Sequence, residues 1–233
     1  MQLSRRTWGD GPRTALLVHG FSDDGSTWWR VGPALAERGW TVVAPDLRGH
    51  GASPRAFSYS FADFADDLVE SLPQGADLAL GHSLGAVALG LAVDRLQPRQ
   101  SVFVDPPWLR AISGDLLQLP LPDSADELPG RWSPEDVDVD LRSNALLDPA
   151  VAPVLVRQLT AGPVPAPAPL RRGTRVLVPE LDPALPLAAH PVLEQLGYTV
   201  VTQPAVRHVM HRDDLEGFVA LLLSQLDEGE LVA

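Results

Sequence analysis

Short apolar runs alternate along this chain with stretches in which hydrophobic residues recur every three or four positions. The apolar runs predict buried strands, and the second pattern predicts helices with one face toward a core. The expected strands cover residues 14–18, 41–44, 77–80, 101–104, 174–178 and 199–202, with an edge strand at 3–8. The expected helices cover residues 26–38, 61–72, 86–93, 191–196 and 213–226. This alternation is typical of an α/β fold, in which crossover helices join the strands of a mostly parallel sheet.

The alternation is interrupted between residues 105 and 173, where prolines and acidic residues are frequent. Only residues 109–117 and 149–159 keep a helical pattern there, and the proline-rich run 162–169 has the composition of a stiff connector. An interruption of roughly 65 residues is too long for an ordinary connection and usually indicates a functional insertion. We therefore expect one domain over residues 1–233, with its core at 1–105 and 174–233 and a cap at about 106–173.

Composition excludes several classes of function. The 233 residues carry a net charge of −12, which argues against nucleic acid or an anionic membrane as the main partner. The chain has no cysteine, so disulfides, thiolate catalysis and cysteine-ligated metals are excluded. The N-terminal residues show no secretory signal, and no window reaches the length of a transmembrane helix. The expected location is the cytoplasm.

The segment Gly81-His82-Ser83-Leu84-Gly85 lies between an expected strand and an expected helix. A Gly-x-Ser-x-Gly pattern in this context is typical of a nucleophile elbow, a sharp and strained turn that exposes the serine. Side chains two positions from the serine would clash, so both flanking positions favour glycine. The sequence therefore predicts Ser83 as a nucleophile.

A serine hydroxyl needs a base beside it and a third group that holds the base. Among the six histidines we favour His208, because it follows the strand 199–202 on a loop at the sheet edge where the elbow also lies. His211 is the near competitor, with packing or helix entry as its simpler role. For the acid we favour Asp182, on the loop after the strand 174–178. Asp105, directly after the strand 101–104, is the alternative, and Glu180 is a third choice.

An acyl-transfer site also needs donors for the developing oxyanion. The backbone N–H groups of Leu84 and of Phe21, in the glycine-containing loop after the first clear strand, are the expected donors. The polar segment 46–53 lacks the Gly-Lys-Ser/Thr end of a phosphate-binding loop, so we interpret it as a structural loop near the site. Trp28, Trp108 and Trp132 are candidates for an apolar substrate pocket, with core packing as the alternative.

Together these motifs resemble the α/β-hydrolase superfamily. The resemblance rests on HGF at 19–21, DLRGHGAS at 46–53, GHSLG at 81–85 and RHVMH at 207–211, in the family's order, and it covers nearly the whole chain. Ser83, Asp182 and His208 also keep the family's order of nucleophile, acid and base. The resemblance implies the α/β-hydrolase fold, with helices flanking a mostly parallel sheet and a helical cap inserted before the acid-bearing strand. It also implies an acyl-enzyme on Ser83 and no need for a metal or organic cofactor.

The function expected from this resemblance is a serine hydrolase that cleaves carboxylic esters, lactones or thioesters of small to medium, hydrophobic acyl groups. Cofactor-free perhydrolysis and carbon–carbon bond hydrolysis use related sites. A ligand-binding receptor or scaffold of the same fold with little turnover is the alternative from another class. The expected partners are a small-molecule ester and water, without nucleic acid or membrane insertion.

Overall fold

Seven strands form one sheet in the computed structural model, which describes residues 1–109, 131–162, 164, 166–167, 174–181 and 183–226. The strand order is β1-β3-β2-β4-β5-β6-β7, and only β1 runs antiparallel to its neighbour. The strands are β1 Arg5–Trp8, β2 Arg13–Val18, β3 Trp40–Pro45, β4 Leu78–His82, β5 Gln100–Val104, β6 Arg175–Pro179 and β7 Thr199–Gln203. All the expected strands are confirmed, and the chain has the mostly parallel sheet of the expected fold class.

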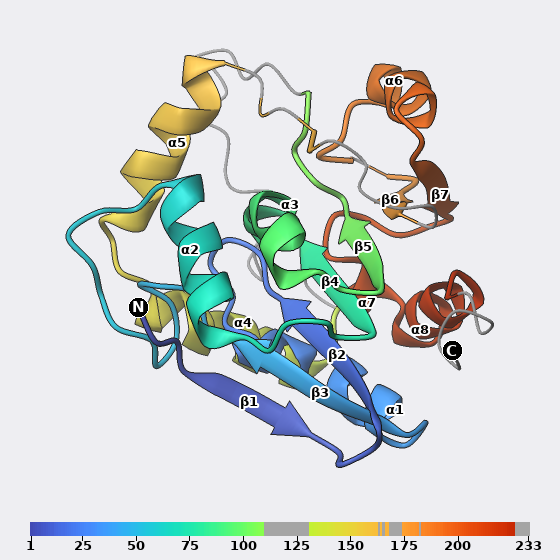
Figure 1. Ribbon diagram of the computed structural model, residues 1–233, viewed down its shortest axis with the longest axis horizontal. Coiled ribbons are helices and arrows are strands. Elements are labelled where there is room, and N and C mark those ends of the chain that lie inside the picture. The colour runs from blue at the N-terminus through green and yellow to red at the C-terminus, as the bar shows by residue number, and fades with distance from the viewer. Residues whose placement is uncertain (110–130, 163, 165, 168–173, 182, 227–233) are drawn as a thin grey trace.

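Helices cover both faces of this sheet (Figure 1). Side chains alternate across a strand, so Leu16 and Val18 of β2 join one core cluster while Ala15 and Leu17 join the other. The first cluster includes buried residues of α2 (Phe61–Ser71), α3 (Leu84–Leu96) and α6 (His190–Gln195). The second includes α1 (Val31–Ala36) and α8 (Leu215–Ser224). Both faces of the central strands are therefore buried, which explains their continuous apolar sequences.

The expected single helix over residues 26–38 is wrong. A short 3₁₀ helix, η1, covers Gly25–Trp28, and α1 begins separately at Val31. Pro33 explains the division: proline has no N–H to donate, so it is tolerated only in the first turn of a helix. The chain must therefore begin a new helix just before it.

Two helices of the interruption are described, α4 over Pro134–Leu146 and α5 over Val151–Ala161. Helix α5 confirms the helical pattern at 149–159, whereas α4 is a helix that the hydrophobic pattern did not predict. The pattern at 109–117 lies outside the described residues except for Leu109. Helix α5 lies beside α2 (Figure 1), and its Gln158 side chain bonds the backbone of Phe61 and Tyr59.

Further short elements complete the C-terminal part: η4 at Leu187–Ala189 before α6, and α7 at Met210–Asp213 before α8. Within the described part of the chain, no helix combines the length and apolar content needed to cross a membrane.

The register between β4 and β5 positions the site. His82 pairs with Val104, the last residue of its strand, and Ser83 N–H donates to the Val104 carbonyl over 3.0 Å. The next residues along the two strands are Ser83 and Asp105. Because the strands are parallel neighbours, these two side chains start from adjacent positions at the carboxyl edge of the sheet.

Candidate active site

Ser83 occupies a strained turn between β4 and α3. Its φ of 51° lies in the left-handed region that residues with a side chain rarely adopt. A Cβ at Gly81 would lie 2.6 Å from the Gly85 carbonyl oxygen, and one at Gly85 would lie 2.4 Å from that of His19. Both flanking glycines are thus required by close backbone contacts, as the elbow interpretation predicts.

The loop after β2 crosses directly beside this turn. A Cβ at Gly20 would lie only 3.4 Å from the Ser83 Cβ, so the loop that continues into Phe21 reaches the expected nucleophile. Leu84 is the first residue of α3, where a backbone N–H has no acceptor within the helix. Both segments named as oxyanion donors therefore lie beside Ser83, although the role itself stays a prediction.

His208 lies on the loop between β7 and α7, and its Nδ1 is 2.6 Å from Oδ2 of Asp105. The carboxylate accepts only, so Nδ1 carries the proton and Nε2 keeps the lone pair that a base requires. The Asp105 side chain is completely buried and also accepts from the backbone N–H groups of Ala184 and Leu185. These hydrogen bonds replace those that the carboxylate would make with water if it were exposed.

The structure thus places the alternative acid, Asp105, on the expected base. Asp182 itself lies outside the described residues. The physical reason is the sheet register: β5 is the direct neighbour of β4, and Asp105 follows it without an intervening residue. Asp105 also has a left-handed φ, 40°, and its N–H donates to the Leu177 carbonyl of β6.

His211, the other candidate for the base, contacts Thr27 and Trp28. His211 belongs to α7, its ring lies 4.5 Å from that of Trp28, and its Nε2 is 3.0 Å from the Thr27 hydroxyl oxygen. Burial lowers the pKa of His211 well below its usual value, and the neighbouring Arg212 charge adds to this. These contacts agree with a packing role for His211.

The segment 46–53 forms a structural loop, as expected. The Asp46 carboxylate accepts from the N–H groups of Gly25 and Ala52, and the Leu47 N–H donates to Nε2 of His19. The His50 ring packs edge-on against Phe21, so the loop supports the segment that carries one expected oxyanion donor. Burial, with a smaller contribution from His19, lowers the pKa of His50 to about 3.

This lowered pKa predicts a loss of stability in acid. An unfolded histidine titrates near pH ~6.5, so as the pH falls the unfolded chain takes up the proton long before buried His50 does. Between about pH 7 and about pH 5 this one group should lower the free energy of unfolding by about 2 kcal/mol. In the His50→Asn variant the side-chain amide can still donate to the Arg48 carbonyl. We expect the free energy of unfolding of this variant to fall by about 2 kcal/mol less than that of wild type over the same pH interval.

Urea unfolding at the two pH values measures this difference for each protein. Equal losses in wild type and His50→Asn would contradict the assignment of His50 as a buried neutral group.

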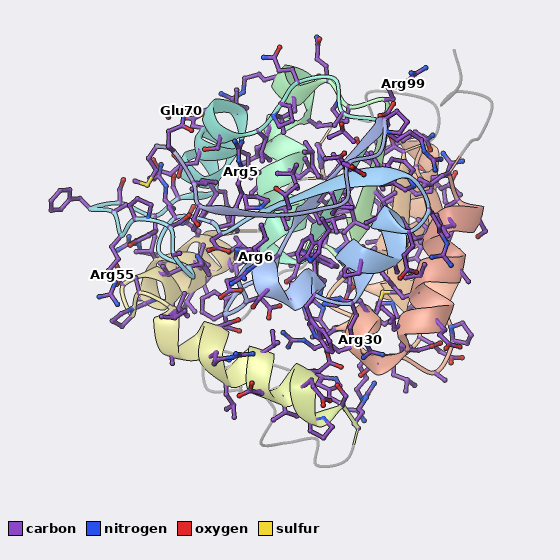
Figure 2. The ribbon with its side chains drawn as sticks, turned by 90° about the horizontal axis from the view of Figure 1, so that it is seen from below. Arg5, Arg6, Arg30, Arg55, Glu70 and Arg99 are labelled. Carbon is purple, nitrogen blue, oxygen red and sulfur yellow. The ribbon has the colours of Figure 1, made fainter. Side chains whose placement is uncertain are left out.

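Helix α4 is fixed to the core by buried charges. Arg212 of α7 bonds Asp140 of α4 over 2.8 Å and Asp23 of the loop after β2 over 2.5 Å. Burial alone would lower the pKa of Arg212, but the two carboxylates outweigh it and raise the pKa. Asp136 of α4 pairs with Arg30, which Figure 2 labels near this helix, over 2.6 Å. Ion pairs therefore hold α4, which lies within the expected cap at 106–173, to Arg212 of α7 and to Arg30.

The three tryptophans named as pocket candidates are all buried. Trp28 lies in the second core cluster, and Trp108 packs against Phe103 and Tyr198. Trp132 donates from Nε1 to Asp213, and the Arg212 guanidinium lies 4.8 Å above its ring. These contacts are those of packed core residues and of a residue bonded to α7, and a pocket role for the three stays a prediction.

Sequence patterns missed the two carboxylates of α4 and their partners. Asp136 pairs with Arg30, and Asp140 pairs with Arg212. A signal for the helix itself was present: Ser133 caps its N-terminus by accepting from Asp136 N–H, and Pro134 and Glu135 suit a first helical turn. Among the described residues, no group of three or more potential ligands is arranged to hold a metal ion.

Comparison with known proteins agrees with the fold. The model of the alpha/beta hydrolase family matches residues 15–221. An uncharacterized protein of Mycobacterium tuberculosis is 46% identical over 103 residues, which are 39% of this chain and 29% of that protein. Lipase LipV of the same organism is 35% identical over 146 residues, covering 61% of this chain and 49% of its own length. The chain thus spans less than half of either curated relative.

Among solved structures, E-2-(acetamidomethylene)succinate hydrolase superposes with a TM-score of 0.76 over 97% of this chain and 95% of its own. Sequence identity is 22%, so this likeness concerns the fold.

Proposed function

Because the chain belongs to the alpha/beta hydrolase family, we propose that it is a serine hydrolase acting on carboxylic esters, lactones or thioesters. The acyl group is small to medium in size and hydrophobic. Ser83 is the nucleophile, His208 the base and Asp105 the acid that orients it. The observation that carries this proposal is the 2.6 Å hydrogen bond from His208 to a carboxylate one strand away from the elbow serine.

In the proposed reaction His208 Nε2 takes the proton of the Ser83 hydroxyl while the oxygen attacks the substrate carbonyl. The tetrahedral intermediate collapses to an acyl-enzyme, and the proton on Nε2 passes to the departing alcohol or thiol. A water molecule then gives a proton to Nε2 and attacks the acyl carbon, and the proton returns to Ser83 as the acid is released. Asp105 stabilises the imidazolium in both steps because it is a buried anion bonded to Nδ1.

The negative oxygen of the intermediate needs donors that are already oriented, which are worth roughly 3–4 kcal/mol each in the transition state. The Leu84 N–H at the start of α3 is one, and the helix dipole adds to it. The Phe21 N–H is the other, and the approach of Gly20 to Ser83 supports it.

The test is turnover of p-nitrophenyl esters of graded acyl length, together with labelling by a fluorophosphonate probe. We expect turnover of the short and medium esters and one label per chain, at Ser83. An intact serine that neither labels nor turns over any ester or lactone would refute the hydrolase and favour a ligand-binding protein of the same fold.

A further inference from the structure

His82, the residue before the expected nucleophile, touches the loop that carries the base. Its Nε2 is 3.0 Å from the backbone carbonyl oxygen of His208. A carbonyl can only accept, so Nε2 carries the hydrogen and donates it. Strand β4 therefore ends at the residue that bonds the loop of His208, directly before Ser83.

The surroundings of His82 leave it one hydrogen bond among the described residues, the one that its Nε2 donates. The ring is buried, and its Nδ1 has no hydrogen-bond partner among the described residues. A Cβ at Gly20 would lie 2.9 Å from that Nδ1, so the loop after β2 closes over it. Burial lowers the pKa of His82 well below its usual value, and positive charge on His208, His211 or Arg212 would lower it further. His82 is thus a neutral ring with one donor.

This bond complements the one made by Asp105. Asp105 holds the His208 ring at Nδ1, whereas His82 holds the backbone of the same residue. A side chain held only at its ring could still pivot as its loop moved. Bonds to both the ring and the main chain fix the position of Nε2, and both come from neighbouring strands, β4 and β5, in one register.

We propose that His82 is a positioning residue that sets the His208 base relative to Ser83 by donating to the His208 carbonyl. The proposal rests on the proposed function, because it assigns His208 the role of base. It adds a role for the residue at the second position of the elbow, whose ring also packs against the His208 ring with the centroids 4.7 Å apart.

Three substitutions separate this role from packing. His82→Gln supplies an amide N–H at about the distance of Nε2, His82→Asn supplies the same amide one bond short, and His82→Leu removes the donor. Displacing a catalytic group by about 1 Å costs on the order of 100-fold. We therefore expect kcat to fall about 10- to 100-fold in the Leu and Asn variants, with KM within about twofold, and to stay within about fivefold of wild type in the Gln variant.

His211→Gln is the matched control. His211 is as buried as His82 and its ring lies 5.7 Å from that of His82, but its described partners are Thr27 and aromatic rings. We expect its kcat to stay within about threefold of wild type, since it makes no recorded bond to the His208 loop. Equal kcat in wild type, His82→Asn and His82→Leu would overturn the proposal, as would equal losses in the Gln and Leu variants.

A second readout needs no turnover. The His208 Nδ1–H at Asp105 should give a downfield proton signal in a histidine ¹H–¹⁵N spectrum, protected from exchange while the loop is held. We expect this signal in wild type and His82→Gln, and a broadened or lost signal in folded His82→Asn. A signal that is equally sharp in the Asn variant would count against the role of His82. Wild type that shows the signal but turns over no ester would instead refute the proposed function.

Discussion

Ser83→Ala is expected to reduce ester turnover by roughly 10⁴- to 10⁶-fold and to abolish fluorophosphonate labelling. Alanine removes the attacking oxygen and leaves the backbone of the elbow with the same left-handed φ, 51° in wild type. The residual rate should come from the oxyanion donors and substrate binding alone. Steady-state kinetics and intact-protein mass after labelling measure the two effects.

Ser224→Ala is the control for this experiment, because Ser224 is an exposed serine at the end of α8. Among the described residues its hydroxyl bonds only the Leu221 carbonyl and the adjacent Gln225 side-chain amide. It should label and turn over like wild type. Turnover that survives Ser83→Ala would mean that the nucleophile is another group or that no acyl-enzyme forms.

Asp105→Asn is expected to lower kcat by about 10⁴-fold, with a smaller change in KM. An amide at this position can present its N–H₂ to His208, which would favour the tautomer with the proton on Nε2 and remove the base. The anion that stabilises the imidazolium is lost as well. Asparagine suits the test, because after glycine it is among the residues that best tolerate the φ of 40° found here.

Asp182→Asn is the matched control, because it makes the same substitution at the acid that the sequence analysis favours. We expect its kcat to stay within about threefold of wild type. If Asp182→Asn were the damaging change and Asp105→Asn the mild one, the acid would be Asp182 and the hydrogen bond at Asp105 would be structural.

Local sequence was sufficient for the strands and for the elbow. Strands buried on both faces are short, continuous apolar runs, so β2, β4 and β5 could be predicted without knowing their neighbours. The elbow was predictable because its close backbone contacts demand glycine at positions 81 and 85.

Helix α4 was missed because its inward face is mostly polar. Its buried residues are Asp136, Val139, Asp140 and Ser143, and a search for hydrophobic periodicity cannot find such a face. Burial of these carboxylates depends on Arg30 and Arg212, which lie more than 70 residues away along the chain. Tertiary contacts of this kind have no local signature.

The acid of the site shows the same limit. Asp105 and Asp182 both follow strands at the correct edge of the sheet, and the sequence alone does not say which strand lies beside β4. The pairing of His82 with Val104 explains the contact at Asp105, because it brings the residue after β5 next to the residue after β4. Which side chain contacts the base is a property of strand order rather than of spacing.

The left-handed backbone at Ser83 has a consequence for engineering this protein. Such a conformation costs roughly 1–3 kcal/mol in a residue other than glycine. At Asp105 the hydrogen bonds to the carboxylate offset a similar cost in free energy. The Ser83 side chain makes no capping hydrogen bond to α3 that would offset its own. With Ser83 as the proposed nucleophile, glycine at this position would raise thermostability and abolish turnover, so a selection for heat resistance alone would favour glycine there. Stabilised variants should be sought at other positions.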